Sequence, residues 1–278
     1  RGSFLFCGTD PSGRPAQPLA GILPFGARTF LMRIPHAIAW PARLWYSSVP
    51  FRRVAQGGDL HAKGTSMADV KTCVLVAASQ FNARDFQDRY EAGLFDYVMA
   101  VDAGFAYLED LGVRPDMALG DFDSLGYVPT CQRVSRFPRE KNQSDLELAL
   151  ERAKTMRYDD VYVYGALGGR IDFELSNLQA AAKYSEAGLC VTLVGEDCAV
   201  RALTGPDVLD LPLMDSGTVS VIAMSDRCTG MIERGMAYSL DDEPLTNRES
   251  RGVSNELVGL PASVGIASGT VLVFYPLP

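Results

Sequence analysis

The chain has 278 residues, of which 47% are hydrophobic and 22% charged, a composition typical of a globular protein with one large or two ordinary domains. The formal charge of −8 is unevenly spread, because residues 1–66 carry a net +6 and the remainder carries −14. A body this acidic argues against a protein that binds nucleic acid.

Residues 1–66 are rich in Arg, Gly and Pro and show no sustained apolar period. The apolar-rich stretch 19–40 is broken by prolines and arginines, so it does not predict a membrane span. We expect 1–66 to be a disordered or non-native N-terminal extension. An Arg-rich, acid-poor segment also resembles an organelle transit peptide. We favour the alternative that 1–66 is an upstream sequence translated by mistake, with Met67 as the true start.

Residues 67–205 alternate between apolar runs and helical patterns, which predicts an α/β domain with a mostly parallel sheet. The apolar runs, expected to be strands, are 70–78, 97–101, 117–119, 133–137, 161–164, 190–194 and 199–203. Four helices are expected. The first ends near Gly93, and the second runs through Leu108 and stops near Gly112. The third begins after Ser144, and the fourth runs from the glycines at 165–169 to about Tyr184.

Residues 206–278 contain short β-rich runs with no helical pattern, which predicts a small all-β sandwich domain or a partial barrel. The expected strands are 218–224, 230–234, 236–240, 262–266 and 270–275. The fold class is therefore an α/β domain followed by a β-sandwich.

Cysteine and histidine usage limits the chemistry. The six cysteines form no C-x-x-C pair, and Cys73 and Cys190 lie inside apolar runs, which favours buried thiols in a reducing, cytoplasmic setting. The two histidines, His36 and His61, both precede residue 67. The acidic body therefore has no histidine for a catalytic triad or a zinc site, and carboxylates must supply acid–base and metal chemistry.

Three aspartates follow predicted strands. Asp102 ends one strand, and Asp121 and Asp123 end the next, two residues apart in Gly120-Asp121-Phe122-Asp123-Ser124. In an extended backbone this spacing puts both carboxylates on one side and Phe122 on the other. Because parallel strands end at one edge of a sheet, the three carboxylates suit Mg²⁺ there. A polar turn at 121–123 and a helix cap at Asp102 are the structural alternatives.

Ser144 and Glu147 fit a capping box at the start of an amphipathic helix, which places Asp145 in its first turn. That structural role explains Asp145 but not Lys141, which precedes the cap and could reach a phosphate. The glycine-rich stretch 165–172 leaves a strand and opens a helix, so its backbone and Arg170 could meet phosphate oxygens. It is neither a P-loop nor a dinucleotide fingerprint, and a plain tight turn is the alternative.

These stretches together resemble the thiamine pyrophosphokinase (thiamine diphosphokinase) family over about residues 70–278. The resemblance rests on Asp102-Ala103-Gly104, Gly120 to Ser124, Lys141 with Ser144 to Leu150, Gly165 to Asp172 with Asn177, and Val253-Ser254-Asn255-Glu256. Taken alone, 252–256 is only a polar turn. The family joins a Rossmann-like α/β domain to a β-sandwich and works as a homodimer.

The resemblance implies Mg²⁺-dependent transfer of diphosphate from ATP to thiamine, giving thiamine diphosphate and AMP. It assigns metal and ATP phosphates to Asp102, Asp121, Asp123 and Asp145, with Asp145, Asp123 and Arg170 as the catalytic group. Lys141, Gln143, Ser144 and Asp172 would line the nucleotide or substrate site. Ser254 and Asn255 would meet thiamine across the dimer interface.

Four positions depart from the family pattern. Ala103 replaces a glycine, Asn142 an acid, Ser144 a threonine and Phe173 a histidine. Serine keeps the helix cap, Asn142 removes one negative charge, and Phe173 cannot hydrogen-bond. Two other functions stay open: a related diphosphokinase acting on another alcohol such as a pterin, and a nucleotide- or thiamine-binding module without catalysis.

Overall fold

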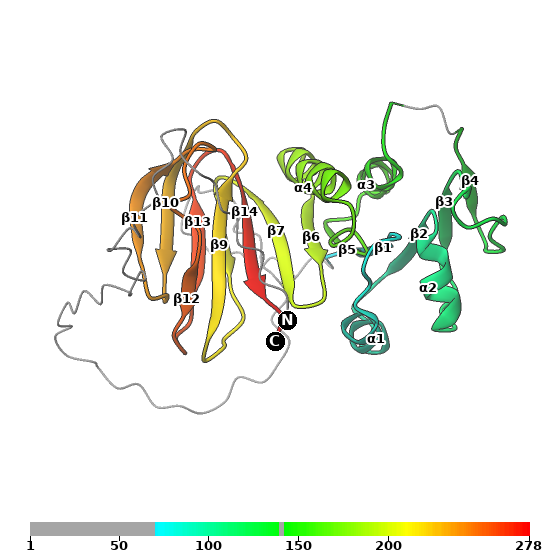
Figure 1. Ribbon diagram of the computed structural model, residues 1–278, viewed down its shortest axis with the longest axis horizontal. Coiled ribbons are helices and arrows are strands. Elements are labelled where there is room, and N and C mark those ends of the chain that lie inside the picture. The colour runs from blue at the N-terminus through cyan, green and yellow to red at the C-terminus, as the bar shows by residue number, and fades with distance from the viewer. Residues whose placement is uncertain (1–69, 139–141) are drawn as a thin grey trace, which may run out of the picture. The chain divides into compact units, whose positions relative to one another are not determined.

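The computed structural model describes residues 70–138 and 142–278 (Figure 1). The predicted extension 1–66 and the predicted site residue Lys141 lie outside these residues. The described chain has a mixed α/β fold with one large sheet and a second, antiparallel sheet.

Six parallel strands form one part of a ten-stranded sheet, in the order β6-β5-β1-β2-β3-β4. They are β1 (Thr72–Val76), β2 (Tyr97–Val101), β3 (Met117–Gly120), β4 (Val134–Arg136), β5 (Asp160–Tyr164) and β6 (Cys190–Val194). The chain first adds strands on one side of β1, and then β5 and β6 on the other side. The strand order therefore reverses between β1 and β5.

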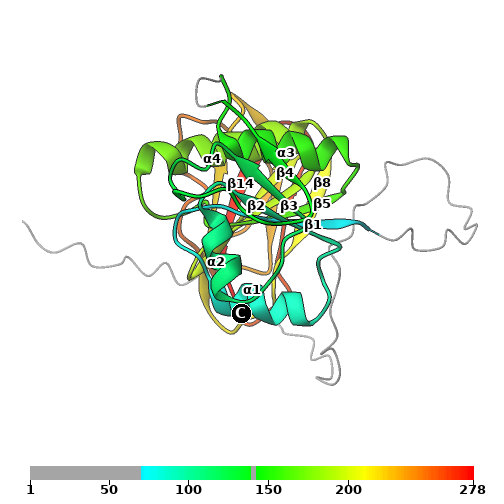
Figure 2. The same ribbon diagram turned by 90° about the vertical axis from the view of Figure 1, so that its right-hand side faces the viewer.

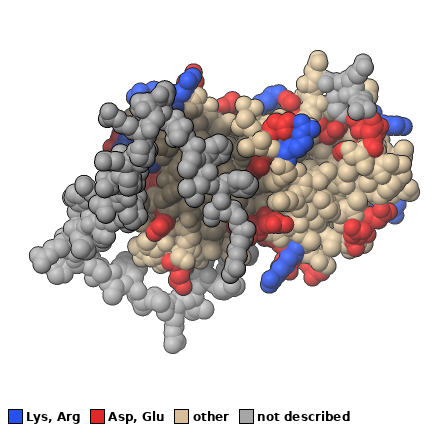
Figure 3. All heavy atoms as spheres, in the orientation of Figure 1, with Lys and Arg blue, Asp and Glu red and all other residues tan. Residues whose placement is uncertain are grey.

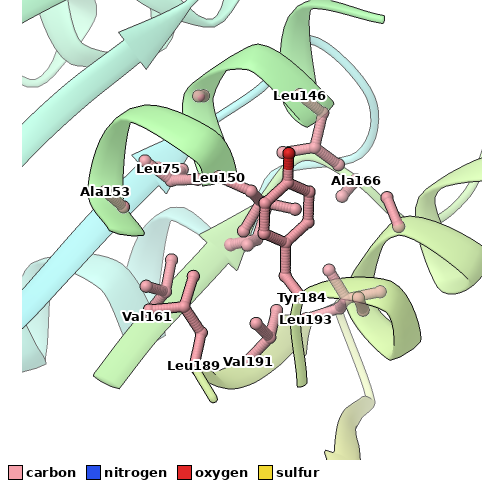
Figure 4. Close-up of a cluster of buried hydrophobic side chains, with 14 of the residues drawn as sticks. Leu75, Leu146, Leu150, Ala153, Val161, Ala166, Tyr184, Leu189, Val191 and Leu193 are labelled. Carbon is pink, nitrogen blue, oxygen red and sulfur yellow. The ribbon is translucent and has the colours of Figure 1, made fainter. Parts of the chain in front are cut away.

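Helices cover both faces of these parallel strands. Figure 2 shows α3 (Asp145–Thr155) and α4 (Ile171–Glu186) on one face, and α1 (Ala83–Glu91) and α2 (Gly104–Asp110) on the other. Each pair encloses its own cluster of buried apolar side chains. In the cluster under α3 and α4, Tyr184 packs among aliphatic side chains such as Leu146 and Leu150 (Figure 4). Because both faces are covered, β1, β2, β3, β5 and β6 are almost continuously buried, as the sequence predicted, whereas the edge strand β4 is mostly exposed.

Four antiparallel strands extend the large sheet beyond β6, in the order β7 (Cys198–Thr204), β14 (Thr270–Pro276), β9 (Gly217–Ala223) and β12 (Asn255–Leu257). The second sheet has the order β11 (Leu240–Leu245), β10 (Cys228–Arg234), β13 (Ser263–Ile266) and β8 (Asp207–Asp210). Apolar side chains from both sheets, including Val219, Val273, Met231 and Val264, form one buried cluster. One sheet thus contains strands from both predicted domains, and the division at residues 205 and 206 stays a prediction.

The strand predicted at 236–240 is wrong. Met236 forms only an isolated bridge to Leu257, and the next strand along the chain is β11, which begins four residues later and pairs with β10. Two further strands, β8 and β12, were not predicted. The remaining strands and the four helices lie within a few residues of their predicted positions.

The prediction of buried thiols is confirmed for Cys73 and Cys228, whereas Cys131, Cys190 and Cys198 are only partly buried. Acidic and basic side chains are interspersed over the face shown in Figure 3. Five described cysteines are free, and burial raises the pKa of the Cys73 thiol. Within residues 70–138 and 142–278, no helix combines the length and apolar character needed to cross a membrane.

Candidate active site

The ends of β2 and β3 bring Asp102 against the loop that carries Asp121. Asp102 donates its backbone N–H to Leu119 at 2.8 Å, and its Oδ1 accepts the Phe122 N–H at 3.1 Å. Gly120 makes the close approach possible: its φ is +154°, and a Cβ there would lie 3.0 Å from the Asp102 Cα. The sequence prediction that these strand ends meet is therefore confirmed.

Phe122 anchors the acidic loop. It is only 3% exposed and packs into the cluster under α1 and α2, although its φ of +61° is unusual for a residue other than glycine. Asp121 is partly buried, Asp123 is exposed, and the Asp121 Oδ1 accepts the Asp123 N–H at 3.0 Å. A buried aromatic ring thus holds two aspartates at the surface of the sheet edge.

The described side chains do not form a ready-made metal cluster. Among residues 70–138 and 142–278, no three His, Cys, Asp or Glu side chains come close enough together to hold an ion. The assignment of Mg²⁺ to Asp102, Asp121, Asp123 and Asp145 therefore stays a prediction.

Asp145 opens α3, as the sequence predicted. The Ser144 Oγ accepts the Glu147 N–H at 3.2 Å, which confirms the cap. The capping box is only half formed, because the Glu147 carboxylate binds Lys183 of α4 and makes no hydrogen bond back to Ser144 within the described residues. Gln143 is partly buried just before the cap. Since α3 crosses from β4 to the parallel strand β5, its first turn lies at the carboxyl edge of the sheet.

The glycine-rich loop follows β5 and lies beside the loop that follows β1. Ser79 donates its N–H to the Gly165 carbonyl at 2.8 Å. At Gly168, with a φ of +72°, a Cβ would lie 2.2 Å from the Gln80 Oε1, so the Gln80 amide rests on the bare glycine backbone. The two loops meet where the strand order reverses, which is the usual place for a ligand in such a sheet.

Arg170 and Asp172 form an exposed two-point ion pair, with Nε–Oδ1 and Nη2–Oδ2 distances of 3.1 and 2.6 Å. The Arg170 guanidinium also lies 4.6 Å from the centre of the Phe173 ring. Hydrogen bonding from Arg170 lowers the pKa of the Asp172 carboxyl. Arg170 is therefore fully charged and is oriented by its own helix.

Ser254 and Asn255 have different environments. Ser254 is exposed, has a φ of +64°, and donates its N–H to the Ser220 Oγ at 3.0 Å. Asn255 is 5% exposed and holds the loop that carries Tyr238, whose side chain is exposed. The structure thus places Ser254 at the surface and Asn255 beneath it.

Sequence reasoning missed three residues near these features. Ser79 and Gln80 lie in the loop after β1, just as Asp102 lies in the loop after β2. Their place after a predicted parallel strand could have marked them as candidates. Tyr238 lies in the stretch wrongly predicted as a strand, where an exposed aromatic residue gives no sequence signal of its own.

Comparison with known proteins identifies this arrangement. The thiamin pyrophosphokinase catalytic-domain family matches residues 93–193, which include Asp102, Asp121, Asp123, Asp145 and the glycine-rich loop. A thiamine pyrophosphokinase from Bacillus subtilis (strain 168) is 27% identical over 182 residues, covering 63% of this chain and 84% of that protein. In sequence and in fold, this chain is thus similar to the thiamine pyrophosphokinase family.

Solved thiamine pyrophosphokinases share the fold. The B. subtilis structure aligns with a TM-score of 0.64 at 24% identity, covering 75% of this chain and all of the other. The Candida albicans structure aligns with a TM-score of 0.60 at 12% identity, covering 83% of this chain and all of the other. The family match at 93–193 contains the acidic strand ends, whereas Ser79, Gln80, Tyr238 and Ser254 lie outside it.

Proposed function

We propose that this chain is a thiamine diphosphokinase, which transfers the β,γ-diphosphate of ATP to the hydroxyl of thiamine and releases AMP. One observation carries the proposal: the catalytic-domain match at 93–193 coincides with the carboxylates and glycines that lie at the carboxyl edge of the parallel sheet. Catalysis needs phosphate-binding groups and a metal site at one place, and this edge offers candidates for both.

ATP would lie at this edge, where the loops after β1 and β5 meet. The reversal of strand order supports a Rossmann-like, nucleotide-binding α/β domain. Bare glycine backbone and the N-terminus of α4 suit phosphate oxygens. Asp172 binds the Arg170 Nε and Nη2 and so orients the guanidinium, whose Nη1 could meet a phosphate oxygen. Lys141, Gln143, Ser144 and Asp172 would complete the nucleotide site.

The chemistry of the predicted carboxylate ligands suits Mg²⁺, although no three of them are already gathered around one point in the described residues. Asp102 and Asp121 each use Oδ1 to accept a backbone N–H. Within the described residues, the Oδ2 atom of each accepts no hydrogen bond, so it could face a cation. Carboxylate oxygens are the ligands that this hard cation prefers. Asp102, Asp121, Asp123 and Asp145 would hold the ion, which when bound neutralises phosphate charge.

The proposed reaction is an in-line displacement. The thiamine hydroxyl oxygen forms a bond to the β-phosphorus, and the bond from that phosphorus to the α,β-bridging oxygen breaks, so AMP leaves with the bridging oxygen. Asp145 or Asp123 takes the hydroxyl proton late in the transfer. Arg170 stabilises charge on the phosphoryl oxygens, because such transfers depend mainly on positioning and charge neutralisation.

Thiamine would bind beside Ser254 and Tyr238. The Tyr238 residue is 71% exposed, while its backbone N–H and carbonyl are both held by Asn255. An aromatic face held in this way suits the positively charged thiazolium ring of thiamine. The nearby Ser254 hydroxyl can donate or accept a hydrogen bond with the pyrimidine.

A homodimer would complete the thiamine site. Ile171 and Leu175, four residues apart on α4, are 83% and 55% exposed, which leaves an apolar stripe. Exposed apolar area of this kind favours association with another protein surface. Sedimentation equilibrium should give twice the mass of the chain, and Leu175→Glu should lower that mass to one chain.

A substrate screen tests the proposed function against its rivals. The full chain is incubated with ATP, Mg²⁺ and either thiamine or a hydroxymethyl pterin, and AMP release is measured. We expect AMP only with thiamine. Release with the pterin alone would indicate a related diphosphokinase, whereas calorimetric binding of ATP and thiamine without AMP would indicate a binding module.

A further inference from the structure

The side-chain amide of Asn255 has no hydrogen-bonding capacity left for a substrate. Its Oδ1 accepts the N–H groups of Tyr238 and Glu256 at 3.0 and 2.9 Å. Its Nδ2 donates to the Tyr238 carbonyl at 2.7 Å and to the Glu233 Oε2 at 2.6 Å. A primary amide offers two donors and two lone pairs, so all four are in use. Asn255 therefore acts as a buried structural support for the Tyr238 segment and does not itself bind substrate.

The segment that Asn255 holds is the connection between β10 and β11. Asn255 fixes both backbone polar groups of Tyr238, and Ala237 donates its N–H to the Glu256 carbonyl at 2.9 Å. Met236 adds a bridge to Leu257. Almost the whole connection is thereby tied to β12, while the Tyr238 ring remains exposed.

Among the described residues, Glu233 is the one side-chain partner of the Asn255 amide, and it favours the same amide orientation as the backbone partners. A carboxylate oxygen can only accept, so the amide must turn its NH₂ toward Glu233 and its oxygen toward the Tyr238 N–H. In the opposite orientation, the amide oxygen would face the carboxylate oxygen, and the NH₂ would face an N–H donor. Together with the backbone groups of Tyr238 and Glu256, the Glu233 side chain on β10 therefore stabilises the orientation that permits both bonds to Tyr238.

The buried Glu233 carboxyl lowers the stability of the folded protein. It is 2% exposed, and its Oε1 has no hydrogen-bond partner among the described residues. Two residues earlier on the same strand, the equally buried Met231 belongs to the apolar cluster between the sheets. A buried carboxyl costs stability that an apolar side chain would not. Stability alone thus does not account for Glu233.

We propose that Glu233 is a positioning residue of the thiamine site: through the Asn255 amide it fixes the Tyr238 segment and the adjoining Ser254 for thiamine. This inference rests on the proposed function, since it concerns the same substrate. Burial raises the pKa of the Glu233 carboxyl, and the bond that Oε2 accepts is compatible with a proton on Oε1.

The test compares Glu233→Leu, Glu233→Met and Glu233→Gln in the full chain, with Glu91→Gln on the exposed end of α1 as the matched control. We measure KM for thiamine, KM for ATP, kcat and the melting temperature. The apolar variants should raise KM for thiamine about tenfold or more, because the amide loses its orienting acceptor. KM for ATP and kcat should change less than about twofold, and Glu233→Gln should restore KM because it keeps an acceptor oxygen.

Calorimetric titration of each variant with thiamine alone should show the same loss and the same rescue. An unchanged KM for thiamine in the apolar variants, or equal changes in all three kinetic parameters, would overturn the proposal. Failure of both apolar variants to fold would assign Glu233 a purely structural role and overturn it as well. A wild-type chain that forms no thiamine diphosphate would instead contradict the proposed function, which the wild-type assay reveals separately.

Discussion

Among individual residues, Asp121 bears most directly on the proposed chemistry. It follows β3, and its Oδ1 is committed to the Asp123 N–H. Asp121→Asn keeps the shape and an acceptor oxygen but removes the charge, so Mg²⁺-dependent turnover should fall by about 10²-fold or more. Asp88→Asn, an exposed aspartate on α1, is the control and should retain full activity.

The measurement for this prediction is AMP release at saturating ATP and thiamine, with thermal denaturation as the check on folding. Asp121→Asn should melt within a few degrees of the wild type, because the loop is anchored through Phe122. Near-normal turnover in a folded Asp121→Asn protein would contradict the metal assignment.

Glu233 makes a pH-dependent prediction about stability. Its raised pKa means that the folded state favours the protonated carboxyl, so that stabilisation is full below the ordinary pKa of 4.5 and is lost as pH rises through the folded-state value. Glu233→Gln has no such titration. The melting temperature of the variant relative to wild type should therefore rise between pH 4.5 and neutrality. A difference that is constant or falls over this range would contradict a buried, proton-favouring carboxyl.

Only some of the individual site residues could be predicted from the sequence. Asp102, Asp121 and Asp123 were predictable because each ends an apolar run. The role of Asn255 was not, because it depends on Glu233, 22 residues away on another sheet. Likewise, the ion pair of Arg170 with Asp172 and its contact with Phe173 depend on side-chain directions that a motif does not specify.

Among the secondary-structure elements, β3 leads into a loop that carries two of the candidate site residues. Phe122 is the buried member of an otherwise polar loop. Phe122→Ala should lower the free energy of unfolding by about 3–5 kcal/mol because it leaves a cavity, and it should also reduce turnover by releasing the two aspartates. Urea denaturation and AMP release measure the two effects.

Phe122→Leu is the matched control, since it keeps apolar bulk at the same positive φ. It should recover part of both losses. A Phe122→Ala protein with wild-type turnover would show that the loop holds its position without the ring.

The strands that sequence reasoning missed are all edge strands. β12 ends the ten-stranded sheet, and β8 and β11 end the four-stranded one. An edge strand buries fewer side chains and needs fewer N–H donors, so β11 can contain two aspartates, a glutamate and Pro244. The apolar signal that reveals central strands is weak in such segments. The central strands and the helices, by contrast, carry their signal in the chain itself.

In the molecule as a whole, a buried ion pair lies where the parallel and antiparallel parts of the large sheet meet. The Arg201 Nη1 of β7 is 3.3 Å from the Asp160 Oδ1 of β5 and donates to the Thr192 Oγ1 of β6 at 2.8 Å. Burial raises the pKa of the Asp160 carboxyl despite the attraction of Arg201. Three neighbouring strands are thus joined by side chains as well as by backbone hydrogen bonds.

Removing one partner should be costly. Arg201→Ala leaves Asp160 buried without its cation and should lower the free energy of unfolding by about 3–5 kcal/mol in chemical denaturation. The double variant Asp160→Leu with Arg201→Met should be more stable than Arg201→Ala, because it buries no unpaired charge. A double variant that is less stable than the single one would contradict this explanation of the buried ion pair.

The most direct test of the proposed function follows the phosphorus atoms. The full chain is given thiamine, Mg²⁺ and ATP labelled at the β-phosphorus, and the products are separated. We expect label in thiamine diphosphate and unlabelled AMP, formed in equal amounts. Formation of ADP with thiamine monophosphate, or no product in the presence of both substrates, would contradict it.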